Sequence, residues 1–227
     1  MKKFCIPLFF IISSITIYTF ISSKSTSLIM IDPSGHAKNV GRKLVEGYER
    51  AQTFKFAEVL RDELKKKYDC RVVLTRFPGE QIFALQNASF ANRLSIDFYL
   101  SLHFYREESA KPKLFIYNLV YDPIFDLAKR NFDPFQFVPI HQVHFINIFN
   151  TKYYGRLIRE VLTESSYQKI FDFYGPYGIP IKPLCGIIAP AIAIEIGICQ
   201  EEQWSLFVEP LVASLQFLSE NKVEMDF

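Results

Sequence analysis

Four side chains in this sequence could together perform metal-assisted hydrolysis: His36, Glu49, His103 and Glu195. Two imidazoles and one carboxylate are a suitable ligand set for a catalytic zinc ion, because three protein ligands leave the fourth position to a water whose pKa then falls to about 7. A further carboxylate could accept the water proton and pass it to a leaving nitrogen. Glu195 fits that role because it stands in the apolar run AIAIEIGI, where burying an unpartnered carboxylate is costly.

Each of these residues also has a plainer interpretation. A lone histidine after a strand is more often a hydrogen-bonded loop residue than a metal ligand. Glu49 alone would be an ordinary carboxylate in the first turn of a helix, where the helix dipole favours it. The residue types by themselves therefore indicate an α/β domain of a hydrolase kind, with or without a metal, and leave the ligand set open.

The elements that would position these residues alternate between strand and helix. Short apolar or β-branched runs predict strands over Ser27–Ile31, Arg71–Thr75, Phe98–Leu102, Lys113–Val120 and Ala189–Gly197. Apolar residues at helical spacing predict helices over Glu49–Tyr68, Gln81–Arg93, Tyr154–Glu164 and Trp204–Ser219. Strands and helices that alternate across short turns are typical of an α/β domain whose parallel sheet is covered by helices.

This fold would bring the chemical groups together. In an open α/β sheet, ligands bind outside the carboxyl ends of the strands. His36 follows the first predicted strand, His103 directly follows the third, and Glu195 lies near the end of the last. Glu49 begins the long helix after a glycine-bearing loop. Parallel strands place their ends side by side, so the large sequence separations do not prevent a common site.

The composition describes a globular protein. The chain has 227 residues, about half of them apolar, and its formal net charge is +2. Its length suits one domain with a single core, and its weak charge does not indicate nucleic-acid binding. Cys5 lies in the N-terminal segment, which leaves Cys70, Cys185 and Cys199. No CxxC pair exists, so neither a disulfide framework nor a cysteine zinc site is indicated, although one bridge stays open.

The N-terminal residues 1–26 have the pattern of an export signal. Lys2 and Lys3 precede an apolar stretch from Phe4 to Ile21, and small polar residues follow it. The stretch is also nearly long enough to span a bilayer as an uncleaved membrane anchor. We therefore expect an exported protein of the periplasm or cell envelope, with cleavage favoured over anchoring.

The segment Asp122–Asn150 lacks clear periodicity and is rich in proline and phenylalanine. Long irregular segments inside a compact domain are usually functional loops or lids. We consider a lid or substrate-contact loop, and a second metal site built from His141 and His144. An irregular excursion with two hydrogen-bonded histidines is favoured over the metal site.

Several stretches resemble, in order along the chain, motifs of the zinc-dependent N-acetylmuramoyl-L-alanine amidases. The first strand leads into Asp32-Pro33-Ser34-Gly35-His36, which is similar to the family's Asp-Pro-Gly-His motif. The other matching stretches are Gly47-Tyr48-Glu49, Val73-Leu74-Thr75-Arg76, Phe90-Ala91-Asn92-Arg93, Asp97–His103 and Pro190–Gly197. One such motif is a weak signal, whereas all of them in the family's order are specific.

The resemblance implies that His36, Glu49 and His103 bind Zn²⁺ and that Glu195 is the catalytic carboxylate. It also implies a single catalytic domain over residues 27–227, with a central twisted, mostly parallel sheet flanked by helices on both faces. The implied substrate is peptidoglycan, cut at the amide between the lactyl group of N-acetylmuramic acid and the L-alanine of the stem peptide.

The sequence also departs from the family pattern. Ser34 is inserted in the first motif, which is expected to alter the loop that carries His36. Ala37 replaces a usual glycine, and Ile198-Cys199-Gln200 replaces the usual Phe and Asn. Two other functions stay open, because a ligand set alone does not choose the scissile bond. They are a non-catalytic peptidoglycan-binding homologue and a zinc peptidase that cuts within the stem peptide.

Overall fold

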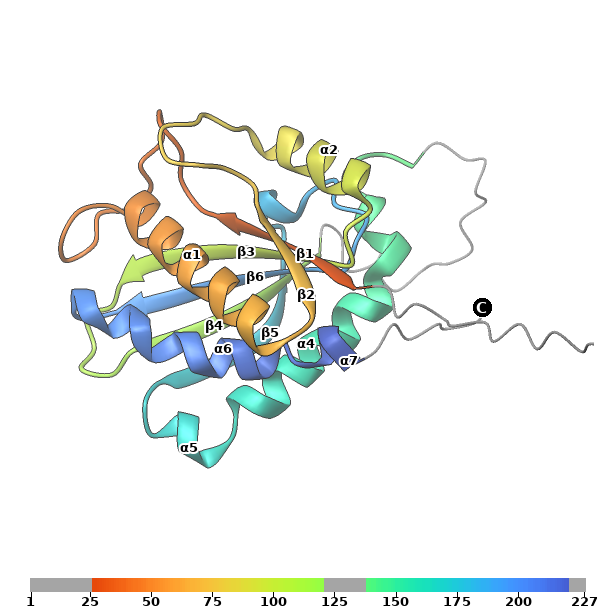
Figure 1. The fold of residues 1–227 in the computed structure, drawn as a ribbon. Helices are drawn as coiled ribbons and strands as arrows, with labels where there is room; N and C mark the ends of the chain where they lie inside the picture. Colours follow the sequence, from red (N-terminus) through yellow and green to blue (C-terminus); the bar gives the residue numbers. More distant parts are fainter. Residues whose placement is uncertain (1–25, 121–137, 221–227) are drawn as a thin grey trace, which may run out of the picture.

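A single mixed sheet organises the chain. The structure, a computed structural model, describes residues 26–120 and 138–220. Six strands pair in the order β2-β1-β3-β6-β4-β5. Their bounds are β1 (Ser27–Pro33), β2 (Cys70–Leu74), β3 (Phe98–Arg106), β4 (Lys113–Leu119), β5 (Asp172–Ile179) and β6 (Ala191–Ile198). Strands β2, β1, β3 and β6 are mutually parallel, whereas β4 is antiparallel to β6 and parallel to β5. The predicted mostly parallel α/β sheet is therefore confirmed (Figure 1).

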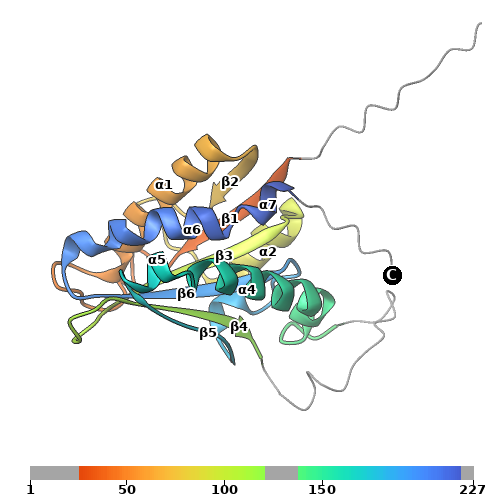
Figure 2. The same ribbon diagram turned by 90° about the horizontal axis from the view of Figure 1, so that it is seen from below.

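Helices cover both faces of this sheet. The longer ones are α1 (Glu49–Lys67), α2 (Ala84–Leu94), α4 (Ile148–Leu162) and α6 (Val208–Ser214). The short ones are α5 (Ser165–Gln168), α7 (Phe217–Glu220), η1 (Val143–Asn147), η2 (Lys182–Leu184) and η3 (Glu201–Phe207). Figure 2 shows β2 and β5 at opposite edges of the sheet, with α1, α6 and α4 along one side.

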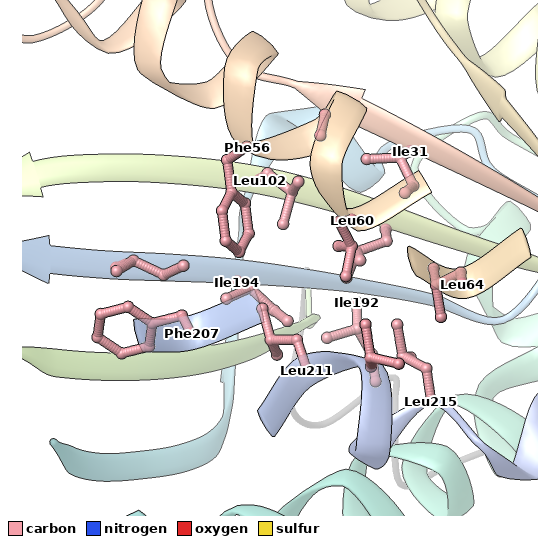
Figure 3. Packing of buried hydrophobic residues seen from close by; sticks show 14 of the residues in the cluster. Ile31, Phe56, Leu60, Leu64, Leu102, Ile192, Ile194, Phe207, Leu211 and Leu215 are labelled. Carbon is pink, nitrogen blue, oxygen red and sulfur yellow. The ribbon is translucent and has the colours of Figure 1, made fainter. Parts of the chain in front are cut away.

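The larger core lies between the sheet and helices α1, α4 and α6. In α1, Phe56, Leu60 and Leu64 recur every four residues and are fully buried, so one stripe of the helix faces the sheet. They meet Leu102 and Ile194 from the central strands, as Figure 3 shows. Acidic Glu49 begins α1 and three lysines end it, and the helix dipole favours this placement of negative charge at the N-terminus and positive charge at the C-terminus.

The second core lies on the other face of the sheet, under α2. Ala88 and Ala91 of α2 pack with Met30, Tyr99 and Ala193. Successive strand residues point to opposite faces. The residues that continue this face toward the carboxyl ends of β1, β3 and β6 are therefore Asp32, Ser101, His103 and Glu195. These carry the polar groups of the candidate site.

Most predicted elements are found with small shifts at their ends, but α4 begins at Ile148, six residues before the predicted start at Tyr154, and three further elements differ. Strand β3 extends to Arg106, so His103 lies within the strand and not after it. Strand β5 was not predicted. The helix predicted over Trp204–Ser219 is broken into η3, α6 and α7.

Parts of the chain on which predictions fall lie outside the described residues. These are 1–25, with nearly all of the expected export segment, and 121–137, which includes most of Asp122–Asn150. The described end of that segment holds η1, with His144, and the start of α4. In the described ranges no helix is long and apolar enough to cross a membrane. Cys70, Cys185 and Cys199 are free thiols, of which Cys70 is buried and the other two are half-buried.

Candidate functional site

The candidate site lies at the carboxyl ends of β1, β3 and β6, beneath the loop that joins β1 to α1. In the parallel pairing of β3 with β6, His103 stands directly opposite Glu195. Neighbours in register project to the same face of a sheet. Glu49 reaches them from the first turn of α1, because the loop before it folds back over the strand ends. The structure thus brings together three of the four residues singled out in the sequence.

Glu49 and His103 form the centre of the site. Glu49 Oε1 lies 3.3 Å from His103 Nδ1, and both side chains are largely buried. Two ligand atoms of a tetrahedral zinc ion with bonds of about 2.0–2.1 Å are separated by about 3.3 Å. The spacing therefore fits two neighbouring ligands of one zinc ion.

The carboxylate of Glu49 is held from several sides. Its Oε1 accepts the backbone N–H of Phe104 (3.2 Å), and its Oε2 accepts that of Arg42 (3.0 Å). The N–H of Glu49 in turn donates to the carbonyl of Arg42. Burial alone would raise the pKa of Glu49, but the hydrogen bonds from His103 and Arg42 outweigh it, so its pKa lies below the usual value. The site thus holds Glu49 as an anion.

Gly41 allows this close packing. Its φ is +76°, a conformation that favours glycine, and a Cβ there would lie 2.7 Å from Glu49 Oε2. The glycine-bearing loop that precedes α1 is therefore shaped around the carboxylate of Glu49.

A hydrogen-bond chain supports His103 from the side opposite Glu49. Ser101 Oγ lies 3.1 Å from His103 Nε2 and 3.3 Å from Asp32 Oδ2. An ionised carboxylate only accepts, so the Ser101 hydroxyl donates to Asp32 and accepts from an N–H on Nε2. The other oxygen of Asp32 accepts from Thr75 Oγ1 (2.6 Å) and Asn87 Nδ2 (2.8 Å).

This chain has a consequence for the other ring nitrogen. With its N–H on Nε2, His103 faces the carboxylate of Glu49 through Nδ1, 3.3 Å away, and Nδ1 either donates a second proton to Glu49 or turns its lone pair toward it. Two acceptors at this distance need a positive charge between them, either a proton or a metal cation. A partner that orients the distal nitrogen of a histidine in this way is typical of metal ligands.

His36 does not contact this pair. His36 and His103 line the same cavity, which has a volume of about 240 Å³. The Nδ1 atom of His36 accepts the backbone N–H of Lys38 at 3.3 Å. Its ring lies 6.3 Å from that of Phe83. Among the described residues, no three His, Cys, Asp or Glu side chains are grouped closely enough to hold a metal ion. The structure thus places His36 at the wall of the site, whereas Glu49 and His103 are in direct contact.

Glu195 is held by two residues that sequence reasoning missed. Arg42 Nη1 lies 2.5 Å from Glu195 Oε1, and the Tyr117 hydroxyl donates to Oε2 at 3.0 Å. Burial, together with the negative charge of Glu195, raises the pKa of Tyr117, so its hydroxyl keeps its proton. The Glu195 side chain is 20% exposed, so solvent reaches it. Glu195 thus projects to the same face of the sheet as His103, and its catalytic role stays a prediction.

The loop that carries His36 is anchored to the body of the protein. The inserted Ser34 donates its N–H to the carbonyl of Leu102, and its own carbonyl accepts from Thr53 Oγ1 and Arg76 Nη2. The buried guanidinium of Arg76 also donates to the carbonyls of Pro33 and Arg50. Burial lowers the pKa of Arg76. The insertion is thus part of a hydrogen-bonded connection among β1, β3 and α1.

The site can support hydrolysis of an amide. It offers anionic and imidazole groups spaced for a metal ion, and beside them a partly exposed carboxylate on the neighbouring strand. Such a carboxylate can take a proton from water and return it to a leaving group.

No protein-family model matches the chain, and no curated protein matches its sequence. Solved structures do match. The N-acetylmuramoyl-L-alanine amidase from Clostridium difficile 630 is similar with a TM-score of 0.61 at 18% identity, over 87% of this chain and 98% of that one. The amidase Ami1 from Mycobacterium smegmatis gives 0.62 at 12% identity, over 86% and 97%. The catalytic domain of the amidase CwlV from Bacillus (Paenibacillus) polymyxa var. colistinus gives 0.59 at 15%, over 85% and 98%. The chain thus has the fold of these amidase domains.

Proposed function

We propose that this protein is a zinc-dependent N-acetylmuramoyl-L-alanine amidase, with Zn²⁺ held by His36, Glu49 and His103. The observation that carries the proposal is the 3.3 Å separation between Glu49 Oε1 and His103 Nδ1, beside Glu195 at the same register of the next strand. Hydrogen bonding through Ser101 leaves Nδ1 of His103 facing Glu49, and a metal cation between the two would satisfy both. His36 lines the same cavity and would supply the third ligand.

The zinc ion would act as a Lewis acid on the scissile carbonyl and lower the pKa of a water molecule to about 7. Glu195 accepts the proton of the attacking water and delivers it to the nitrogen of the departing L-alanine. Arg42 and Tyr117 fix the two oxygens of Glu195 from opposite sides, which orients the carboxylate before substrate arrives. Ser101 and Asp32 would hold His103 in the tautomer that leaves Nδ1 available to the metal.

The choice of scissile bond rests on the fold and on the motifs of the sequence. The similar solved structures are N-acetylmuramoyl-L-alanine amidases. We therefore assign as substrate the amide between N-acetylmuramic acid and the L-alanine of the peptidoglycan stem peptide. Residues 27–227 would form the catalytic domain. Residues 1–26 would direct export to the periplasm or cell envelope, where peptidoglycan lies, either as a cleaved signal or as a membrane anchor.

Mass spectrometry of the products tests this function. The full-length protein, loaded with zinc, is incubated with isolated peptidoglycan, and the released fragments are identified. We expect free stem peptides that begin with L-alanine, their loss on chelation, and their return when zinc is restored. Glu195→Gln should lower kcat at least 100-fold, because removing a positioned general base commonly costs about 10²–10⁴ in rate. Glu202→Gln, at an exposed position of η3, is the matched control and should act as the wild type does.

Other outcomes would assign a different function. Cuts within the peptide would move the protein to the zinc peptidases. Binding to peptidoglycan without any product, in a protein that takes up zinc, would indicate a non-catalytic homologue. Activity of Glu195→Gln close to that of the wild type would contradict the assigned role of the carboxylate.

A further inference from the structure

A row of aromatic rings continues from Glu195 across the open edge of the sheet. In the pairing of β4 with β6, Phe115 stands opposite Glu195 and Tyr117 opposite Ala193. In the pairing of β4 with β5, Tyr174 stands opposite Phe115 and Tyr177 opposite Tyr117. Because residues in register share a face, these rings project to the same side as Glu195.

The rings are in mutual contact and nearly parallel at the centre of the row. The centroids of Phe115 and Tyr174 are 4.7 Å apart with an interplanar angle of 14°. Those of Phe115 and Tyr117 are 6.2 Å apart at 2°, and those of Tyr117 and Tyr177 are 6.3 Å apart at 39°. Stacked neighbours hold one another in place, so the row forms a stiff surface. We call these rings, together with Tyr105 of β3, the aromatic platform.

Tyr105 closes the platform on the side of β3. Its ring centroid lies 6.4 Å from that of Phe115, and the guanidinium of Arg42 lies 6.0 Å from its centroid. The ring crosses β6 above Gly197, where a Cβ would stand 2.5 Å from the tyrosine oxygen. Gly197 therefore leaves the space that this ring occupies. The platform borders Glu195 through Tyr105, Phe115 and Tyr117.

Among the residues that the structure describes, the platform is partly exposed on one face and backed by the core on the other. Leu114 and Ile116 of β4 alternate with the platform residues and are fully buried in the core on the opposite face of the sheet. Phe115 and Tyr117 are half-buried, and Tyr177 is 47% exposed. Rings that only filled the interior would have no exposed face. The partial exposure of successive rings indicates a surface that receives a flat ligand.

We propose that the aromatic platform binds the sugar rings of a glycan strand. The face of an aromatic ring carries partial negative charge, and the C–H groups on one side of a pyranose ring carry partial positive charge, so the two stack without a charged partner. The hydroxyl groups at the edges of the tyrosines can hydrogen-bond to sugar hydroxyls while the rings stack. A flat row of partly exposed rings suits a chain of pyranoses better than a compact ligand does.

The position of the platform supports this ligand. The proposal rests on the proposed function, in which the scissile amide is attached to a sugar of the glycan strand. That sugar must therefore lie beside Glu195 when the amide is cut, and the platform begins at Glu195. The next sugars of the strand would extend over β4 and β5. The platform would thus place the amide in the site by holding the polymer that carries it.

Calorimetric titration tests the proposal without catalysis. The ligands are soluble oligosaccharides of N-acetylglucosamine, which contain no amide that the enzyme would cut. The full-length protein is compared with Tyr177→Ala and Tyr174→Ala. The control is Tyr153→Ala, a tyrosine on α4 that is 36% exposed and belongs to no part of the platform. Each platform variant should bind the oligosaccharide about tenfold more weakly, which is toward the low end of losses seen when an aromatic stacking contact is removed. Tyr153→Ala should bind as the wild type does.

The same variants are then tested on peptidoglycan. We expect a higher KM for the polymer and an unchanged kcat, because Tyr174 and Tyr177 lie on β5, one strand beyond Tyr117, which holds Glu195. Unchanged oligosaccharide affinity in both variants, or no binding by the wild type, would overturn the proposal even if the amidase reaction is found. If the wild type binds the oligosaccharide, the variants do not, and no amidase activity is found, the proposed glycan binding stands and the proposed function is refuted. If Tyr174→Ala does not fold, Tyr177→Ala decides alone, and Tyr177→Phe should keep most of the affinity.

Discussion

Ser101→Ala tests the hydrogen-bond chain behind His103. Ser101 is fully buried, and its hydroxyl lies between His103 Nε2 (3.1 Å) and Asp32 Oδ2 (3.3 Å). Without it, the N–H on Nε2 has no acceptor, and the ring loses the contact that directs Nδ1 toward Glu49. Loss of such a partner commonly weakens metal binding about 10- to 100-fold, which is about 1.4–2.7 kcal/mol. We expect the zinc affinity of Ser101→Ala to fall within this range.

The substitution also affects stability, and the two effects must be separated. Leaving a buried polar group without a partner costs about 1–3 kcal/mol in the free energy of unfolding. Ser214→Ala is a matched control, because Ser214 is 1% exposed and its hydroxyl donates to the carbonyl of Leu211 within α6. This variant loses a comparable buried hydrogen bond far from the site. It should be destabilised and should keep the zinc affinity of the wild type.

Zinc affinity is measured by competition with a chromophoric chelator, and stability by urea unfolding of the metal-free protein. The hypothesis requires Ser101→Ala to lose zinc affinity and Ser214→Ala to retain it. A Ser101→Ala protein that binds zinc within twofold of the wild type would refute the assigned tautomer of His103, whatever its stability. Equal losses of affinity in both variants would show that general destabilisation, and not orientation of His103, controls metal binding.

Two further predictions concern the loop before α1 and the end of β3. Gly41→Ala should lower both zinc affinity and stability, because φ is +76° and the new Cβ would lie 2.7 Å from Glu49 Oε2. The free energy of unfolding should fall by about 1–3 kcal/mol, which equilibrium unfolding measures. Competition with a chelator measures the loss of zinc affinity. Glu107→Gln should cost about 2 kcal/mol at pH 7, since the N–H of Ser109, Tyr105 and Lys113 lower the pKa of Glu107 to about 2. That stabilisation is present above about pH 4.5 and is lost as the pH falls toward 2, so urea unfolding of variant and wild type should converge near pH 2 and differ at pH 7.

The central strands were predictable because a strand buried on both faces of a sheet has an almost continuous run of apolar residues. Strands β1 and β6 are covered on both sides and are therefore almost continuously apolar. Strand β5 is an edge strand, its residues are mostly half-buried, and it contains two glycines and a proline. Such a segment lacks both the apolar run and the alternation that indicate a strand. Its place in the sheet comes from pairing with β4, a contact between distant parts of the chain.

A residue of the site was predictable only where its polarity differs from that of its neighbours in the sequence. Glu195 is a carboxylate in an apolar strand, and that cost indicates a site from the sequence alone. Arg42 lies in an exposed loop, and Tyr117 is one of two aromatic residues in β4, so neither conflicts with its surroundings. Their importance follows only from contacts with Glu195. The Tyr117 contact depends on the antiparallel register of β4, and the Arg42 contact depends on the fold of the loop before α1; no local pattern encodes either.

The antiparallel strand explains why the site extends beyond the ends of the parallel strands. A parallel strand beside β6 would present only its carboxyl end to the site, and the chain would then leave the sheet. Strand β4 instead runs back past Glu195, and its alternating residues Phe115 and Tyr117 lie along the same face. One of them holds the carboxylate, and both extend the face toward β5. The reversal of β4 thus places the aromatic platform directly beside Glu195, an arrangement that suits the proposed cleavage of an amide carried by a glycan strand.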